Sequence, residues 1–345
     1  MKNINKKLSI GIVGCGRISS KHLSAINSLY LKSKLQLKCV CDSDIKKAKL
    51  VSIKYRVPAY RNMYEMAKNE KLDIISILTE SGNHPTHFVN LAKYAKIFVI
   101  EKPLALKTKD VFKVIKIAKK YKNKIFVVKQ NRFNPAIQQL KNAIINNRFG
   151  KKFLATVRVR WSRSDKYYKL APWRGKEFMD GGVIGNQASH HIDMLIWLMG
   201  KIRKVNAAGI KAIAKIESFD TVIANLKFAS GALGIVEATT ATRPKDLEGS
   251  ISILGDKGSA VIGGFSMNLV EKWNFSKILK KDKSIFKFST KPKTIYGDGH
   301  TSFYLSLIKS LASKGTLHPK NSLHTVEVIE AINKSAKQNK TIYIK

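Results

Sequence analysis

Cysteine is scarce in this chain, and its few cysteines form no recognisable pattern. Cys15, Cys39 and Cys41 are the only three in 345 residues. Their odd number and the lack of a CxxC pair argue against a disulfide framework and against a structural zinc site. Long hydrophobic runs are missing too, since no segment reaches the roughly 18 apolar residues of a membrane helix. The basic N-terminal stretch leads directly into a glycine loop instead of a signal cleavage site. We therefore expect a soluble, cytoplasmic protein.

Acidic residues are also few. The chain has 23 aspartates and glutamates against 64 lysines and arginines, which gives a formal net charge of +41. Only 11 of the basic residues are arginine, and the lysines are spread along the whole chain. A nucleic-acid-binding module usually concentrates its basic residues on one face, beside stacking aromatic residues or a recognition motif. We expect no specific nucleic-acid partner and no membrane partner, and the excess charge favours anionic small molecules.

The pattern of apolar residues changes after the first third of the chain. Apolar runs at 8–13, 35–41, 73–78, 97–100 and 125–128 alternate with helix-like segments. This alternation predicts a doubly wound parallel sheet with helices on both faces. Beyond residue 130, longer stretches rich in β-branched residues predict a mostly antiparallel sheet with several helices. The expected fold is α/β, with a Rossmann domain over residues 1–128 and an α+β domain over residues 129–345.

A glycine loop follows the first expected strand, in the stretch GIVGCGRIS. Gly14 allows a tight turn, Gly16 lets a pyrophosphate approach, and the next helix offers free N–H groups to phosphates. Ser19 replaces the third glycine of the GxGxxG fingerprint. Asp42 lies 26 residues after Gly16, where an acid can bind both ribose hydroxyls of the adenosine. No arginine follows closely, so NAD is favoured over NADP; the alternative role of Asp42 is a helix cap.

The third strand runs into the loop TESGNHPTH, at 79–87. Ligands of doubly wound folds lie beyond the carboxyl ends of the strands, so this loop should border the cofactor. His84 and His87 have the spacing of metal ligands, but no cysteine or third ligand accompanies them, and a helix start is the simpler interpretation. We expect no metal.

Two further motifs carry a family resemblance. They are Glu101-Lys102-Pro103 and the pattern GGxxxNxxxHxxD at 181–193, which contains Asn186 and His190. With the glycine loop and Asp42, they make nearly the whole chain resemble the glucose-fructose oxidoreductase, inositol dehydrogenase and MocA (Gfo/Idh/MocA) family. The resemblance implies a Rossmann domain, an α+β domain built on an open sheet, and oxidation or reduction of a sugar hydroxyl with a nicotinamide cofactor.

Oxidising a secondary alcohol requires a base for the hydroxyl proton and a group that stabilises the developing alkoxide. A lysine near the nicotinamide and a histidine suit these tasks, and the resemblance implies that Lys102 and His190 share them. Which of the two takes the proton stays open at this point. His191 competes with His190 for the role. Asp193, three residues after His190, either orients the imidazole or pairs within its helix.

Asn186 departs from the aspartate that many family members carry four residues before the histidine. An amide cannot act as a base, so Asn186 is expected to position the substrate by hydrogen bonds. The same asparagine, with the segments 127–144, 157–175 and 297–311, resembles the UDP-N-acetylglucosaminuronic acid 3-dehydrogenases. A substrate with a diphosphate and a carboxylate needs cationic donors, which Arg163 and Arg174 provide in this interpretation. WRGKEF stands where that group often has WRGTW.

The resemblance also implies the remaining site residues. The substrate set comprises Lys102, Asn131, Arg163, Tyr167, Tyr168, Asn186 and His190. The cofactor set comprises Gly14, Gly16, Arg17, Ile18, Asp42, Thr79, Asn83, His84, Glu101, Lys102, Gln130, Trp173 and Arg174. We expect an NAD-dependent dehydrogenase that oxidises the C3 hydroxyl of an anionic nucleotide sugar, and a homodimer or homotetramer. The alternatives are an inositol or free-sugar dehydrogenase and a non-catalytic NAD-binding regulator.

Overall fold

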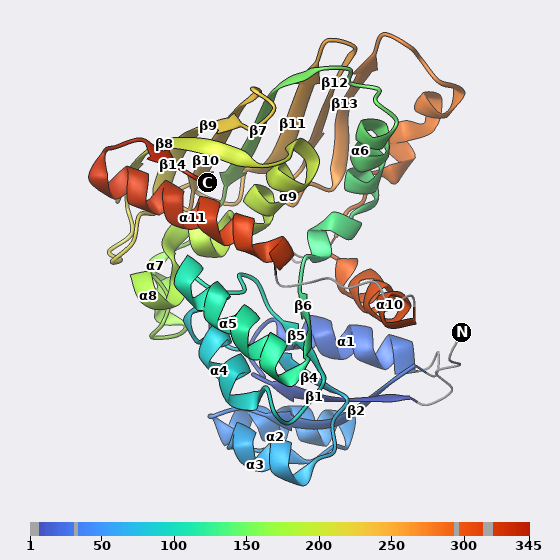
Figure 1. Ribbon diagram of the computed structural model, residues 1–345, viewed down its shortest axis with the longest axis vertical. Coiled ribbons are helices and arrows are strands. Elements are labelled where there is room, and N and C mark those ends of the chain that lie inside the picture. The colour runs from blue at the N-terminus through green and yellow to red at the C-terminus, as the bar shows by residue number, and fades with distance from the viewer. Residues whose placement is uncertain (1–6, 31–33, 293–296, 313–319) are drawn as a thin grey trace. The chain divides into compact units, whose positions relative to one another are not determined.

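The computed structural model describes residues 7–30, 34–292, 297–312 and 320–345. The chain forms two compact units, shown in Figure 1. The first comprises Met1–Val128 and His300–Leu323, and the second comprises Lys129–Gly299 and His324–Lys345. The sequence analysis placed 300–323 in the second domain. The structure places this segment in the first unit, where Tyr304 is fully buried and its hydroxyl lies 2.8 Å from the His22 ring.

The first unit is built on a six-stranded sheet in which every described strand pair is parallel. The strand order β3-β2-β1-β4-β5-β6 is that of a Rossmann fold, whose order reverses between β1 and β4. Strands β1, β4 and β5 are fully or almost fully buried, as their Val- and Ile-rich sequences predict for strands covered on both faces. Their bounds are β1 (Leu8–Val13), β2 (Leu35–Cys41), β3 (Ala59–Tyr60), β4 (Ile74–Ile77), β5 (Ile97–Ile100) and β6 (Lys124–Val127).

Helices connect these strands, and local signals explain where several begin and end. The Asp44 side chain caps α2 by accepting the N–H of Lys46, and Asn62 caps α3 in the same way. In α5, Val111, Val114 and Ala118 are buried at helical spacing. The helices are α1 (Ser19–Tyr30), α2 (Ile45–Tyr55), α3 (Met63–Asn69), α4 (His84–Leu91), α5 (Thr108–Tyr121) and α10 (Gly299–Ala312), with a 3₁₀ turn η1 (Ser81–Asn83).

The second unit contains an eight-stranded sheet in the order β13-β12-β11-β7-β10-β9-β8-β14. Among its described pairs only β7 and β10 are parallel, so the expected mostly antiparallel sheet is confirmed. The strands are β7 (Lys152–Arg160), β8 (Ile202–Ile210), β9 (Thr221–Phe228), β10 (Leu233–Thr239), β11 (Glu248–Gly255), β12 (Gly258–Gly263), β13 (Leu269–Phe275) and β14 (Ile342–Tyr343).

Helices cover one face of this sheet. In Figure 1, α6, α9 and α11 lie along the same side, and their apolar residues form one core with those of the strands. On the opposite face Ile223 and Leu233 are more than half exposed, so the sheet is open there. The remaining elements are η2 (Gln130–Phe133), α6 (Pro135–Ile145), α7 (Asp165–Lys169), α8 (Glu177–Asp180), a π-helical turn (Val183–Gln187), α9 (Ser189–Met199), η4 (Lys280–Phe288) and α11 (Lys320–Gln338).

The three cysteines are free and buried in the first unit. Burial, with the nearby Asp42 carboxylate, raises the pKa of the Cys15 thiol to about 12. Because the thiolate is the reactive form, these thiols are poor nucleophiles. No helix in the described part of the chain is long and apolar enough to cross a membrane.

Candidate active site

The glycine loop lies at the carboxyl end of β1, beside the end of β4. Gly14 has φ +102° and donates its N–H to the carbonyl of Cys41 at 2.8 Å. A Cβ on Gly14 would lie 2.8 Å from the carbonyl carbon and oxygen of Leu78, so only glycine fits. A Cβ on Gly16 would meet no protein atom within 4 Å. The loop therefore leaves open space beside Gly16, where a dinucleotide pyrophosphate fits.

Asp42 joins the end of β2 to this loop. Its Oδ2 accepts the N–H of Cys15 at 2.8 Å, and its Oδ1 accepts the N–H of Asp44 at 2.9 Å. Asp44, and not Asp42, supplies the cap of α2. Asp42 thus stays half-exposed next to the glycine loop, with Arg17 exposed nearby in sequence. These residues fit the adenosine side of a dinucleotide site.

The loop after β4 is organised by histidine side chains. His84 is buried, and its Nδ1 and Nε2 lie 2.8 Å and 3.0 Å from the carbonyl oxygens of Pro103 and Thr79. Burial has the larger effect and lowers the pKa of His84, and the hydrogen bonds with the two carbonyl oxygens offset it only in part. Thr79 Oγ1 lies 2.9 Å from the His87 ring, and Asn83 donates to Glu80. The His84 side chain therefore connects the loop after β4 with the loop after β5, both of which border the expected cofactor site.

Glu101 and Lys102 follow β5 at the same edge of the sheet. Glu101 is 5% exposed, and its Oε1 lies 2.9 Å from Nε2 of His22. Its Oε2 accepts the backbone N–H of Lys102 at 3.0 Å. Lys102 itself is half-buried. The Glu101 carboxylate thus binds His22 and the main chain of Lys102, and its expected contact with the cofactor stays a prediction.

In the second unit, His190 lies near the start of α9. It is half-buried, and its Nε2 lies 3.1 Å from the amide nitrogen of Gln130 in η2. His191 is fully buried and packs edge-on against Trp161, with ring centroids 5.6 Å apart. Of the two adjacent histidines, His190 is the one with an exposed part. Gln130, for which a cofactor contact is predicted, lies against His190 through its amide nitrogen.

Asp193 pairs with the segment that carries Gln130. It accepts two hydrogen bonds from the Arg132 guanidinium, at 2.8 Å and 2.9 Å, and lies 2.7 Å from the Lys129 ammonium. Burial alone would raise the pKa of Asp193, but these two cations lower it far below its ordinary value. Neither role considered from the sequence describes this arrangement, because Asp193 ties η2 to α9. It thereby fixes the segment whose Gln130 touches His190.

Asn186 lies on the π-helical turn, which two glycines with positive φ precede. A Cβ on Gly182 would lie 2.7 Å from Cβ of Ser218, so the turn needs glycine there. The Asn186 amide nitrogen donates to Oδ1 of buried Asp180, whose Oδ2 accepts the N–H of Gly175 at 2.6 Å. An ionised carboxylate only accepts hydrogen bonds, so the nitrogen of the Asn186 side chain faces Asp180. The carbonyl oxygen of the same side chain then faces the opposite side.

A cationic aromatic cluster stands beside this turn. Arg174 lies over the rings of Tyr167 and Trp173, at 4.3 Å and 4.5 Å from their centroids, and donates to the Tyr167 hydroxyl at 2.5 Å. Gln187 donates to the same hydroxyl at 2.9 Å. Its buried Nε has no hydrogen-bond partner among the described residues. The contacts of Arg174 in this part of the chain are thus with aromatic rings and a hydroxyl, and the buried carboxylate of Asp180 accepts from the next residue, Gly175.

Arg163 and Tyr168 have partners within the second unit. Arg163 is 8% exposed, pairs with Asp246 at 2.9 Å, and donates to Gln187 at 3.3 Å. The Tyr168 hydroxyl lies 2.9 Å from Oγ1 of Thr240. Contact of these two residues with a substrate stays a prediction.

Other buried polar atoms lack partners. Oε1 of Gln130 and Oδ1 of Asn131 are buried with no hydrogen bond to the described residues. A buried polar group without a partner is costly, so such atoms favour a polar ligand in contact with them. The buried Oδ1 of Asn131 is therefore consistent with the predicted contact with a ligand.

Several residues that shape the site were absent from the expectations. Asp180, Gln187 and Asp246 position the amide and the arginines of the second unit, and His22 positions Glu101 of the first. Only Asp180, which directly precedes the glycine pair, had a usable sequence signal. The others are identified by tertiary contacts alone.

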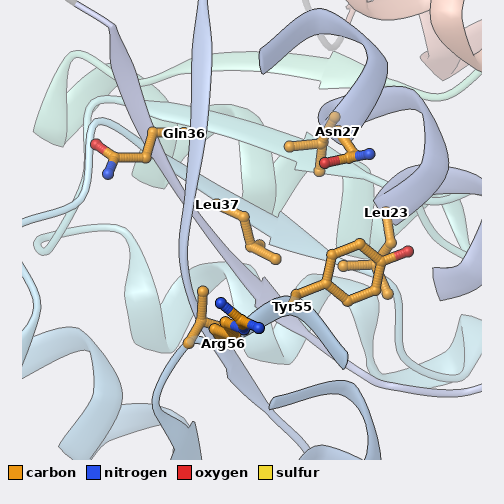
Figure 2. A pocket seen from close by; sticks show the side chains of 8 residues that line it. Leu23, Asn27, Gln36, Leu37, Tyr55 and Arg56 are labelled. Carbon is orange, nitrogen blue, oxygen red and sulfur yellow. The ribbon is translucent and has the colours of Figure 1, made fainter. Parts of the chain in front are cut away.

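Figure 2 shows a pocket of about 290 Å³ in the first unit. It involves the start of β2, whereas the glycine loop, Thr79 and Glu101 follow the carboxyl ends of strands. This pocket is therefore separate from the candidate site. Its lining residues are Leu23, Ile26, Asn27, Gln36, Leu37, Tyr55, Arg56 and Val57.

The glycine loop, the strand order and the separate sheet domain define the chain as a Rossmann-fold oxidoreductase with a second α+β domain. Comparison with protein families supports this class. Residues 8–129 match the model of the oxidoreductase family with an NAD-binding Rossmann fold, and residues 137–261 match the GFO/IDH/MocA C-terminal domain. The chain belongs to the Gfo/Idh/MocA family and is an NAD-binding dehydrogenase.

Solved structures and curated relatives add detail. The WlbA dehydrogenase from Chromobacterium violaceum, solved with NADH and UDP-GlcNAcA, is 34% identical; the match covers 99% of this chain and 96% of that one, with a TM-score of 0.92. WlbA from Bordetella pertussis, with the same ligands, is 33% identical, and 99% of each chain is covered with a TM-score of 0.90. The myo-inositol 2-dehydrogenase of Thermotoga maritima is 27% identical over 73% of this chain and 74% of its own length.

Proposed function

We propose that the protein oxidises a secondary hydroxyl, at C3, of a UDP-linked N-acetylglucosaminuronic acid or a related nucleotide sugar. The carrying observation is Arg174, a cation held between Tyr167 and Trp173, whose buried Nε has no hydrogen-bond partner in the described chain. Arginine binds phosphate and carboxylate through paired N–H donors, so this position suits an anion. Within the proposal the anion belongs to the sugar nucleotide or to the cofactor.

The proposal divides the chemistry between Lys102 and His190. NAD, when bound along Gly14, Gly16 and Asp42, accepts the hydride from the sugar carbon. Lys102 follows β5 at the edge where Rossmann folds bind their ligands, and it supplies positive charge for the developing alkoxide. His190 offers a half-buried imidazole for the hydroxyl proton. Gln130 holds that imidazole through its amide.

Asn186 serves as a hydrogen-bonding residue in this proposal. Since its amide nitrogen donates to Asp180, its carbonyl oxygen faces the other way and suits a sugar hydroxyl. Asn131, whose buried Oδ1 lacks a hydrogen bond to the described residues, is a second acceptor. Both residues act by positioning, and neither takes a proton.

The two WlbA structures support the nucleotide-sugar assignment because their identities of 34% and 33% extend over almost the whole chain. The inositol dehydrogenase of T. maritima favours the alternative, a dehydrogenase of inositol or a free sugar. For such a neutral substrate Arg174 would have no anion other than the cofactor to bind. This difference makes the two candidates separable by experiment.

A substrate panel tests the proposal. The purified protein is mixed with NAD and, separately, with UDP-GlcNAcA, UDP-GlcNAc, free N-acetylglucosaminuronic acid, myo-inositol and free hexoses, and NADH is followed by absorbance. A 2-oxoacid is added in parallel to reoxidise tightly bound NADH. We expect turnover of UDP-GlcNAcA, much less of UDP-GlcNAc, and none with Lys102→Ala. Turnover of inositol alone would refute the nucleotide-sugar assignment, and NAD binding with no turnover would favour a regulatory protein.

The proposal includes a cytoplasmic homo-oligomer. The open face of the second sheet carries Ile223 and Leu233, which are 53% and 56% exposed, beside the ion pairs of Arg160 with Glu237 and Glu248. An apolar and charged face of this kind suits a second copy of the chain. Sedimentation equilibrium distinguishes monomer, dimer and tetramer, and a monomer at all concentrations would refute this part.

A further inference from the structure

A buried series of hydrogen-bonded side chains in the first unit has no part in the proposed transfer of hydride and proton. His22 of α1 lies between two partners: its Nδ1 is 2.8 Å from the Tyr304 hydroxyl of α10, and its Nε2 is 2.9 Å from Oε1 of Glu101. The Tyr304 hydroxyl is also 3.2 Å from Oγ of Ser76 in β4. All four side chains are at most 5% exposed. Such a group is costly to bury unless every member is satisfied.

The direction of the hydrogen bond between His22 and Glu101 follows from the carboxylate. Burial alone would raise the pKa of Glu101, but the hydrogen bond from His22 and the charges of His22, His300 and Lys102 lower it to about 2. An ionised Glu101 only accepts, so Nε2 of His22 must donate. The Tyr304 hydroxyl lies 2.8 Å from Nδ1 of His22 and 3.2 Å from Oγ of Ser76, so it links these two side chains. Burial raises the pKa of Tyr304, which keeps that hydroxyl protonated.

This series of hydrogen bonds ends at Lys102, the proposed catalytic lysine. Oε2 of Glu101 accepts the backbone N–H of Lys102 at 3.0 Å, so the carboxylate that His22 orients also fixes the main chain that carries Lys102. The negative charge of Glu101 favours the charged form of the Lys102 ammonium. The titratable groups that interact with Glu101 are His22, His84, His300, Tyr304 and Lys102.

A metal ion is the competing explanation for part of this cluster. Donor atoms of His22, Glu101 and His300 lie within 4.8 Å of one another, and both ring nitrogens of His300 are buried without a hydrogen bond to the described residues. Two observations disfavour a cation. First, Nε2 of His22 carries the proton that Glu101 accepts, so this nitrogen has no lone pair for a metal. Second, the positive charge of Lys21 acts on His300 and that of Lys102 acts on Glu101, and both charges oppose a further cation.

We propose that His22 and Tyr304 are positioning residues for Lys102, acting through Glu101: they hold the carboxylate that fixes the lysine's backbone and maintains its ammonium charge. The inference rests on the proposed role of Lys102. His300, whose Nε2 lies 4.0 Å from Oε1 of Glu101, forms no hydrogen bond with these side chains, so it does not orient the carboxylate. This asymmetry between His22 and His300 separates a proton network from a metal site, in which both histidines would be equivalent ligands.

The test measures Lys102 directly. Trace acetylation across a pH series, quantified for the Lys102 peptide by mass spectrometry, gives its pKa without any need for turnover. In Glu101→Gln we expect Lys102 to be acetylated faster than in the parent at the same pH, because a neutral amide no longer favours the charged ammonium. The alkaline limb of the kcat/KM profile, where the ammonium charge is lost, should move to lower pH. Tyr304→Phe, which removes only the hydroxyl, should lower kcat about three- to tenfold with unchanged NADH affinity.

The control variant is His300→Leu, for which we expect parental turnover and parental labelling of Lys102. If Lys102→Met abolishes turnover, the inference is overturned when both Glu101→Gln and Tyr304→Phe show the acetylation of Lys102 and the pH profile of the parent. Full activity of Lys102→Met would instead refute the proposed function. One equivalent of bound zinc, iron or manganese in the purified protein, lost in His300→Leu, would replace the proton network with a metal site.

Discussion

Replacing Asp193 with asparagine should destabilise the second unit strongly. The substitution keeps the size of the side chain but removes the charge that faces Lys129 and Arg132. The side chains of these two cations are only 15% and 20% exposed. Thr325, which donates to the same carboxylate at 3.1 Å, keeps an acceptor in the amide oxygen. The perturbation therefore removes one buried negative charge and replaces one of the two oxygens that accept from Arg132 with an amide nitrogen, which only donates.

The size of the effect follows from the burial of the partners. Removing one member of a buried ion pair costs about 3–5 kcal/mol, because the remaining charge is left without compensation. For a domain of this size each kcal/mol lowers the Tm by about 2–4 °C, so we expect a fall of about 6–20 °C. Since Asp193 also fixes the segment of Gln130, kcat should fall even at temperatures where the variant is folded.

Differential scanning calorimetry at neutral pH, at low and at high salt, measures the change. Asp44→Asn is the matched control, since it removes the exposed pair of Asp44 with Lys47 while asparagine still caps α2. We expect the control to melt like the parent and the Asp193→Asn deficit to persist in salt, because buried pairs are screened little. A Tm loss in Asp193→Asn no larger than in the control would refute the buried cluster.

Three more outcomes are expected. Gly14→Ala should destabilise the first unit, because its Cβ would lie 2.8 Å from the Leu78 backbone, whereas Gly16→Ala should fold normally but bind NADH more weakly in a fluorescence titration. Equal losses of stability in the two variants would contradict this prediction. Arg174→Met should raise KM for a UDP-sugar or NAD more than tenfold and Arg174→Lys less, since lysine keeps the charge; parental KM values for Arg174→Met would count against an anion site. Burial lowers the pKa of His300 to about 3, so as pH drops below 6.5 the unfolded chain binds a proton that the folded chain does not. The free energy of unfolding therefore falls by up to about 1.4 kcal/mol per pH unit, and urea titrations should show a smaller fall in His300→Leu.

The first unit was largely predictable because its signals are local. A strand with buried residues on both faces must be apolar throughout, and the runs of β1, β4 and β5 meet that demand without reference to distant residues. Gly14 was identifiable because a tight turn after a strand excludes a Cβ. The same reasoning could not place α10 in this unit. Its partners, His22 and Ser76, lie more than 220 residues away in sequence.

The second unit shows where residue type alone misleads. Arg163 and Arg174 belong to one sequence segment and carry the same charge, so nothing local distinguishes them. The distinction depends on Asp246, 83 residues later, which pairs with Arg163, whereas Arg174 contacts aromatic rings and a hydroxyl. A charged side chain signals a ligand only after its intramolecular partners are known.

Asn186 illustrates the same limit for an amide. In the sequence it replaces a carboxylate common in the family, which implies the loss of an acidic group at that point. In the structure a carboxylate is still present, because Asp180 lies against the Asn186 amide nitrogen. That contact determines which end of the amide faces Asp180 and leaves the carbonyl oxygen on the opposite side. The substitution therefore keeps a hydrogen-bond acceptor but removes a group able to take a proton at this position, so in the proposed reaction that task falls to Lys102 and His190.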